Sequence, residues 1–305
     1  MLTIQDRVYG EHTFTSKLII DLINSPQVQR LKGISQFGPP DKWYFKTGFS
    51  RFEHSIGVAI LLAKLGASIE VQATGLLHDA GHTAFSHVAD WLFGNPEDEG
   101  LNDRLYYQTI SSGEISSILR RNSIPPSSIK NITDFPILKR NIPNMCADSI
   151  DYCLRELIIN GQKEKSQQIL KNLSVFDEKI IFTSKEPAKL YANEFNKLNN
   201  EHWTGWKAVT VYTIMKRMFT LALDNDIITR EDFSKTDQHI LNKVYSCQIP
   251  EIHEDIKILE TQTYQPAEHP KKIRFCDPEF LQDEKLIKLS QVDKEFANKI
   301  KEIMA

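Results

Sequence analysis

The chain has 305 residues, a formal net charge of −3 and 25% charged residues. Its 41% of hydrophobic residues suffices for a packed core and excludes global disorder, and the 13 scattered glycines and 13 prolines exclude collagen-like and low-complexity classes. Since the balance of charge is acidic, we expect no stable complex with nucleic acid.

The N-terminus has no apolar signal segment, and no stretch approaches the roughly 20 apolar residues of a membrane span. The four cysteines are Cys146, Cys153, Cys247 and Cys276, and no pair has CxxC spacing. Free buried thiols in a reducing compartment are the simplest interpretation. We therefore expect a cytoplasmic protein without a membrane partner.

Hydrophobic periodicity predicts that the first two thirds of the chain are mostly helical. Proline, glycine and capping signals divide this part into helices over residues 17–34 (broken at Ser25-Pro26), 52–70, 72–79, 85–93, 107–121 and 144–160.

The pattern changes after residue 172. Residues 173–184 contain two short β-prone runs around Asp177-Glu178, which predict a hairpin. Further elements are expected as helices over 186–198 and 203–224, a short strand over 272–276 and a closing helix over 285–304. The predicted fold is mainly α, a helical bundle with a small β-hairpin and a C-terminal α(+β) appendage. We place the domains at residues 1–225 and 226–305.

Chemistry-bearing side chains are concentrated between residues 52 and 91, where four of the nine histidines lie. The set comprises His54, His78, Asp79, His82, His87 and Asp90, with Asp148 on a later predicted helix. Imidazole and carboxylate are ligands for borderline and hard divalent ions. His78 and Asp79 end one predicted helix, and an antiparallel return brings the start of the preceding helix, at His54, close to them. Asp148 can supply a fourth ligand.

A second pattern lies on the predicted helix over residues 144–160. Asp148, Tyr152, Arg155 and Glu156 fall on one helical face at positions i, i+4, i+7 and i+8. Such a polar face is often only solvated, but here we interpret it as facing a cleft.

Three motifs occur in order: RFEHSIG at residues 51–57, LLHDAGHTAFSH at 76–87 and DSIDY at 148–152. In sequence and spacing they resemble the HD-domain phosphohydrolase superfamily and, within it, the deoxynucleoside triphosphate triphosphohydrolases (dNTPases). The resemblance is strong from about residue 7 to 160, weaker to about 223 and adds little beyond. It implies an HD-domain helical bundle.

The resemblance implies that His54, His78, Asp79 and Asp148 hold one divalent ion. Manganese, iron, zinc, nickel and magnesium all remain open for such a ligand set. The resemblance also implies that His82, oriented by Asp90, lies near the reacting phosphorus, and that His87 and Arg51 contact the phosphate. The sugar contacts that it implies come from Gln36, Phe37, Tyr152, Glu156 and Tyr191. His82 would protonate the leaving oxygen or help to position the phosphate.

Two departures from the dNTPase pattern concern the phosphate tail. Tyr107-Gln108 stands where the dNTPases carry a His-Glu pair, and Lys185 is the available substitute for a phosphate-binding arginine. A lysine provides a point charge rather than a fork of donors. Metal chemistry is therefore predicted more firmly than triphosphate preference.

The resulting hypothesis is a metal-dependent phosphohydrolase that converts a dNTP to deoxynucleoside and triphosphate. One alternative is a phosphatase or phosphodiesterase for nucleoside monophosphates or other small phosphoesters, and another is a non-catalytic nucleotide-binding module. The resemblance also implies assembly into homo-oligomers, since dNTPases often form dimers or larger assemblies.

Overall fold

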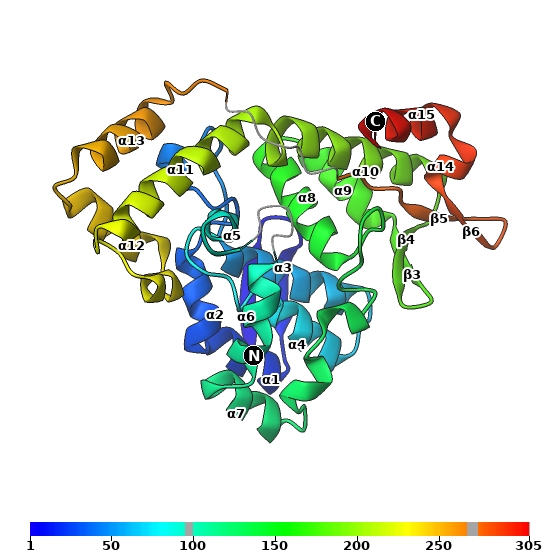
Figure 1. The fold of residues 1–305 in the computed structure, drawn as a ribbon. Coiled ribbons are helices and arrows are strands. Elements are labelled where there is room, and N and C mark those ends of the chain that lie inside the picture. Colours follow the sequence, from blue (N-terminus) through cyan, green and yellow to red (C-terminus); the bar gives the residue numbers. More distant parts are fainter. Residues whose placement is uncertain (95–99, 267–273, 305) are drawn as a thin grey trace.

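The computed structural model describes residues 1–94, 100–266 and 274–304. Most of the described chain is helical, as predicted (Figure 1). The α-helices are α1 (Lys17–Asn24), α2 (Pro26–Arg30), α3 (Arg51–Lys64), α4 (Ile69–Leu77), α5 (His87–Phe93), α6 (Leu101–Ile110), α7 (Gly113–Arg121), α8 (Ala147–Ile159), α9 (Lys163–Lys171), α10 (Lys185–Leu198), α11 (Trp206–Asp224), α12 (Asp237–Ser246), α13 (Pro250–Thr261), α14 (Leu289–Val292) and α15 (Lys294–Met304).

The strands form two small sheets. They are β1 (Leu2–Asp6), β2 (Gly10–Phe14), β3 (Leu173–Phe176), β4 (Lys179–Phe182), β5 (Glu279–Gln282) and β6 (Lys285–Lys288). β1 and β2 form an antiparallel hairpin, and the second sheet has the order β3-β4-β5-β6 with β4 and β5 parallel. The predicted hairpin over 173–184 is confirmed as β3–β4, whereas the N-terminal hairpin was not predicted because its apolar alternation covers only two short strands.

Several predicted boundaries are wrong for identifiable reasons. The expected helix over 52–70 is divided between α3 and α4, because Gly66 adopts a φ of +75° after α3 and the Ser68 hydroxyl caps α4. The expected helix over 107–121 is likewise divided before Gly113. Residues 274–276 of the expected strand are irregular, while 272 and 273 lie outside the described residues. The first residues of the expected closing helix form β6, because they pair with β5.

Two hydrophobic cores organise the molecule. The first lies between α1, α3, α4, α8 and α10 and includes residues of α15, and the second lies between α5, α11, α12 and α13. Tyr152 of α8 packs against both cores. The junction of the cores is therefore at the face of α8 that carries the predicted site residues.

The C-terminal third packs at two separate places. α12 and α13 lie beside α11 at one end of the molecule, whereas β5, β6, α14 and α15 lie beside α10 and β4 at the other (Figure 1). The division at residues 225 and 226 stays a prediction. All four cysteines are free and buried, and among the described helices none has the length and apolarity needed to cross a membrane.

Candidate active site

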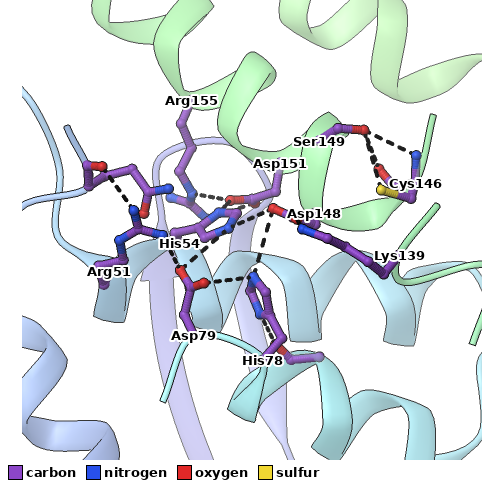
Figure 2. Close-up of polar contacts among 12 residues, drawn as sticks. Arg51, His54, His78, Asp79, Lys139, Cys146, Asp148, Ser149, Asp151 and Arg155 are labelled. Carbon is purple, nitrogen blue, oxygen red and sulfur yellow. Dashed lines mark hydrogen bonds and ion pairs between the residues drawn. The ribbon is translucent and has the colours of Figure 1, made fainter. Parts of the chain in front are cut away.

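The predicted metal ligands come from three helices that meet at the first core. α3 and α4 pack closely against each other, which brings His54 near the start of α3 to His78 at the end of α4. Asp79 follows in the turn after α4, and Asp148 lies in the first turn of α8. Figure 2 shows the four side chains directed toward one another. The antiparallel return predicted from the sequence thus occurs.

His54, His78 and Asp148 each direct one potential ligand atom into a group in which these atoms lie within 4.8 Å of one another. Oδ1 of Asp148 is 3.2 Å from Nε2 of His54 and 3.8 Å from Nε2 of His78. The carboxylate of Asp79 is 3.4 Å from Nε2 of His78 and 3.9 Å from Nε2 of His54. Asp79 therefore lies at the rim of the same cluster.

The donor atoms fit a divalent ion. Nδ1 of His78 donates to the carbonyl of Gly75 at 2.7 Å, which leaves Nε2 as the acceptor, and this buried Nε2 has no hydrogen-bond partner. Nδ1 of His54 donates to Asp151 at 2.7 Å, and its Nε2 donates to Oδ1 of Asp148 at 3.2 Å, so Nε2 faces the cluster and would become a ligand atom once an ion displaces its proton. Two imidazole nitrogens beside two carboxylates form a donor set suited to a divalent cation, with the outer hydrogen bonds that metal-binding histidines usually make.

Neighbouring positive charges lower the pKa values of both carboxylates of the cluster. Burial raises the pKa of the Asp79 carboxyl, but Arg51 and the neighbouring histidines outweigh burial and hold it well below its ordinary value. Asp148 behaves similarly: burial is outweighed by Lys139 and His54, and the pKa is again well below the ordinary value. Both carboxylates are thus ionised and available as ligands at neutral pH.

Asp151 joins the cluster to a buried ion network behind it. Oδ2 of Asp151 accepts from His54 and also from Nε of Arg155 at 2.7 Å, while the Tyr9 hydroxyl donates to Oδ1 at 2.8 Å. Arg155 further donates to Asp6 at 2.7 Å. The N-terminal hairpin therefore supports the orientation of His54 through two linked side chains.

Gly57 makes this network sterically possible. A Cβ at this position of α3 would lie 1.7 Å from Nη2 of Arg155 and 2.1 Å from Oδ1 of Asp151. The glycine of the RFEHSIG motif thus serves the packing behind the cluster. The expectation that Arg155 faces a cleft is wrong, because this fully buried side chain turns to Asp151 and Asp6 instead.

Arg51 and the two remaining motif histidines lie on the open side of the cluster. Arg51 donates to Asp79 at 2.8 Å and to the Ser86 hydroxyl at 2.9 Å, and its Nη2 is 3.2 Å from Nε2 of His87. His82 lies 3.3 Å from Asp79. Burial, with the charge of Arg51, lowers the pKa of His82 to about 3.

The expected partner of Asp90 differs in the structure. Its carboxylate accepts from Nδ1 of His87 at 3.1 Å and from the Leu101 amide at 2.9 Å, rather than orienting His82. The spacing of three residues within the first turn of α5 places His87 directly over Asp90.

A polar cavity of about 330 Å³ opens onto the cluster, and we call it the metal-side cavity. Its lining includes the predicted residues Arg51, His78, Asp79, His82, His87, Asp148, Gln36 and Tyr152. The polar residues of its lining to which the sequence motifs assign no role include Asn102, Asp103, Lys139, Arg140 and Arg274. The last of these comes from the C-terminal third.

A smaller cavity of about 90 Å³ adjoins it, and we call it the aromatic cavity. Its lining consists of Gln36, Phe37, Tyr44, His87, Tyr152, Glu156, His202, Trp203, Tyr212 and Arg274. The predicted sugar-side residues Gln36, Phe37, Tyr152 and Glu156 thus meet in one place.

Glu156 is the polar centre of the aromatic cavity. It accepts from Trp203 Nε1 at 2.8 Å, from Lys46 Nζ at 2.9 Å and from Nδ1 of His202 through a short hydrogen bond. Nε2 of His202 in turn contacts the Tyr44 hydroxyl at 2.9 Å. Burial raises the pKa of Glu156, but His202 and Lys46 outweigh burial and lower it.

Two of the predicted substrate contacts, Lys185 and Tyr191, line neither cavity. Nζ of Lys185 lies 3.4 Å from Asp293, beside α14 and α15. Tyr191 is buried in the first core, with its ring 5.6 Å from Phe182 and 5.9 Å from Phe195. The sequence suggested Lys185 because it follows the hairpin, but its partner comes from more than 100 residues further along the chain.

The site residues whose roles sequence reasoning missed left only weak signals. Asp151 and Arg155 lie four apart on α8 with opposite charges, a spacing typical of a helical ion pair. Lys139 lies in an irregular loop, and His202 lies in a π-helical turn, Asn199–Trp203, for which no periodic pattern exists. These residues were found only through their tertiary contacts.

Comparisons with known proteins agree with this geometry. The sequence model of the HD domain family matches residues 51–127. The uncharacterized protein YdhJ of Bacillus subtilis is 34% identical over 301 aligned positions, and the match covers 95% of this chain and 92% of that protein. The chain belongs to the HD-domain phosphohydrolase superfamily. Its His-His-Asp cluster lies within the part of the HD fold formed by α3, α4 and α8.

Three further proteins show how far the similarity extends. Metal-dependent phosphohydrolase cns2 of Cordyceps militaris is 25% identical over 91% of this chain and 84% of that protein. A SAMHD1 homolog of Dictyostelium discoideum, named as a deoxynucleoside triphosphate triphosphohydrolase, is 25% identical, and the match spans 84% of this chain but 57% of that protein. The crystal structure of a phosphohydrolase from Bacteroides thetaiotaomicron has the same fold, with a TM-score of 0.68, 16% identity and coverage of 96% and 95% of the two chains.

The chain is thus an HD-type metal-dependent phosphohydrolase. The expected superfamily and mainly α fold are confirmed.

Proposed function

We propose that this HD-domain protein hydrolyses deoxynucleoside triphosphates to deoxynucleoside and triphosphate. The observation that carries the proposal is that two different cavities meet at the metal cluster. One is polar and has cationic side chains, and the other is lined by aromatic rings. A nucleotide has the same division into an anionic and a ring-bearing part.

The residues of the cluster would hold the ion. His54, His78, Asp79 and Asp148 are the proposed ligands, and their donor set is compatible with any of the divalent metals named above. A bound ion would supply a water of lowered pKa and would polarise the phosphate ester. The chain itself orients the His54 ring through Asp151, so that Nε2 points into the cluster and would release its proton when the ion binds.

We assign the metal-side cavity to the phosphate tail of the nucleotide. Arg51 is held in place by Asp79 and Ser86, so its guanidinium is already oriented toward the cavity. Lys139, Arg140 and Arg274 line the same cavity and replace the cation that we had expected from Lys185. Because the pKa of His82 is lowered to about 3, its ring is neutral at pH 7, so His82 would help to position the phosphate rather than protonate the leaving oxygen.

We assign the aromatic cavity to the nucleoside part of the substrate. Trp203 and Tyr152 pack edge to face with ring centroids 5.0 Å apart, and Phe37 packs edge-on against His202 at 4.5 Å. Oε1 of Gln36 is buried without a hydrogen-bond partner and lies where both cavities meet. An unpartnered buried acceptor is costly, so a ligand hydroxyl or amino group that donated to it would be favoured.

A nucleoside monophosphate is the second candidate substrate. It is favoured by the ion pairs of Arg140 with Glu279 at 2.9 Å and of Lys139 with Asp148 at 2.6 Å, which occupy two of the cavity's cations. A shorter phosphate group requires fewer of them.

The two candidates are distinguished by the products. The manganese-loaded protein is incubated with a panel of dNTPs and dNMPs, and the products are resolved by anion-exchange chromatography. Deoxynucleoside together with intact triphosphate supports the proposal. Inorganic phosphate released from a dNMP alone supports the second candidate, and nucleotide binding without any product supports a non-catalytic module.

A further inference from the structure

Lys139 contacts a proposed metal ligand from outside the sequence motifs. Its Nζ donates to Oδ2 of Asp148 at 2.6 Å. The other oxygen of that carboxylate, Oδ1, is the one that faces His54 and His78. One oxygen of Asp148 therefore serves the cluster, and the other serves the lysine.

The backbone of Lys139 is firmly placed. The amides of Ala147 and Asp148 donate to the carbonyls of Ile137 and Leu138 at 2.9 and 3.3 Å, which ties the lysine loop to the start of α8. The Leu138 side chain is fully buried in the first core. The lysine side chain itself is 35% exposed and lines the metal-side cavity, so only its flexible stem and ammonium are free to reorient.

The charges around the cluster are balanced in pairs. Arg51 accompanies Asp79, and Lys139 accompanies Asp148, from opposite sides of the cluster (Figure 2). A divalent cation held between the two carboxylates compensates the same two negative charges. Arg51 and Lys139 then present positive charge to the cavity, which favours an anion there.

The two cations differ in their freedom to respond. Arg51 is buried and also donates to Ser86 and to the Gln36 carbonyl, so its position does not depend on Asp79 alone. For Lys139, Asp148 is the hydrogen-bond partner found within the described part of the chain. An ion that compensates the charge of Asp148 through Oδ1 therefore weakens mainly the hold of that carboxylate on Lys139.

We propose that Lys139 is a phosphate-binding residue of this enzyme, kept beside the metal site by Asp148 and turned toward the phosphate when an ion takes over that carboxylate. This inference rests on the proposed function, because it requires a phosphate group over the cluster. It adds a residue from the loop before α8 to the phosphate-binding set.

The test uses Lys139→Met, which keeps the stem and removes the charge, and Lys139→Arg, which keeps the charge. The control is Lys165→Met. Lys165 donates to Glu194 at the same distance of 2.6 Å and is 40% exposed, but it lies on α9. Calorimetry measures Mn²⁺ binding to each full-length protein, and then binding of inorganic phosphate to the Mn²⁺-loaded protein.

We expect Lys139→Met to bind Mn²⁺ at least as tightly as the wild type, because a competing cation has been removed from Asp148. Its affinity for phosphate should fall by about tenfold or more, the size of one lost charge-assisted hydrogen bond. Lys139→Arg should retain most of the phosphate affinity, and Lys165→Met should match the wild type. Thermal melts establish that each variant is folded.

Unchanged phosphate affinity in Lys139→Met would overturn the inference. Loss of Mn²⁺ from this variant would also overturn it, because Lys139 would then act only by positioning Asp148. The readout is independent of turnover. If the wild type binds phosphate but hydrolyses no dNTP, the proposed function fails, while the role of Lys139 is still decided by its variants.

Discussion

The metal-side and aromatic cavities share Gln36, His87, Tyr152 and Arg274, yet they are assembled differently. The proposed metal ligands come from α3, α4, α8 and the turn after α4, and an outer layer of buried ion pairs supports them. The aromatic cavity is assembled from loops, α8, the π-helical turn and α11, and its polar centre is one carboxylate with three donors. The proposed metal ligands are therefore placed by helices packed against one another, whereas the aromatic cavity depends in addition on loop and π-helical segments.

The largest effect is expected from Asp79→Asn, which directly tests the proposed metal ligands. The substitution removes one ligand charge, so the purified protein should lose its metal, and kcat should fall by more than the roughly 10–100-fold that loss of an outer partner costs. Metal analysis and product chromatography measure the two quantities. Asp134→Asn, an exposed aspartate, is the control. A metal-replete Asp79→Asn protein with normal turnover would refute the ligand assignment, and His78→Gln provides a second variant.

Gly57→Ala tests the buried ion pairs of Asp151 and Arg155 that lie behind the metal cluster. Its Cβ would collide with Arg155 and Asp151, so the buried ion pairs must separate, and we expect a loss of about 3 kcal/mol or more in the free energy of unfolding. Urea unfolding measures it. Metal affinity should also fall, because Asp151 orients His54. Ala63→Gly on the same helix should cost only about 1 kcal/mol. Equal losses in the two variants would contradict the role of Gly57.

Asp237 connects the loops that border both cavities, and it provides a pH test. Its carboxylate accepts from the amides of Ser35 and Phe85 at 2.8 and 2.7 Å, and burial raises its pKa from 3.8 to about 7. The folded state thus binds this proton more tightly than the unfolded chain does. The stabilisation is full below pH 3.8 and is lost as the pH rises through 7.

Between pH 5 and pH 8, the wild type should therefore lose on the order of 2 kcal/mol of unfolding free energy that Asp237→Asn does not lose. Urea titrations of both proteins in the presence of a chelator measure the difference at each pH. Parallel pH dependences of the two proteins would show that Asp237 does not carry this titration.

The smallest effect is expected from Glu156→Gln, which tests the aromatic cavity. The amide keeps the size of the side chain, but it cannot accept from all of His202, Trp203 and Lys46. We expect KM for the nucleotide to rise by about tenfold while metal content is unchanged. Glu194→Gln, whose partner is Lys165, is the control. Loss of metal from Glu156→Gln would show that the two cavities are not separable.

The sequence motifs predicted much of the metal cluster and little of the aromatic cavity. His78 and Asp79 are adjacent, His54 starts a neighbouring helix, and short helices leave few ways to pack, so local sequence was enough to bring them together. Helical spacing placed Glu156 on a face toward a cleft, but its role as a sugar contact came only from the resemblance, and its partners His202 and Lys46 were not predicted. They lie 46 and 110 residues away from Glu156, and no local pattern reports such contacts.

By itself, the amino-acid sequence determined the superfamily and the mainly α fold, because these depend on helical periodicity and on motifs whose order and spacing resemble those of a family. It also named the candidate metal ligands, through that resemblance and through the expected antiparallel return that brings His54 close to His78. Tertiary structure alone decided that Arg155 faces the hairpin, that Asp90 serves His87, and that Lys139 and Arg274 reach the metal-side cavity. The physical reason is that a side chain's partner is chosen by the packing of whole elements. Two of those elements, the N-terminal hairpin and the C-terminal third, contact the site without carrying any of its motifs.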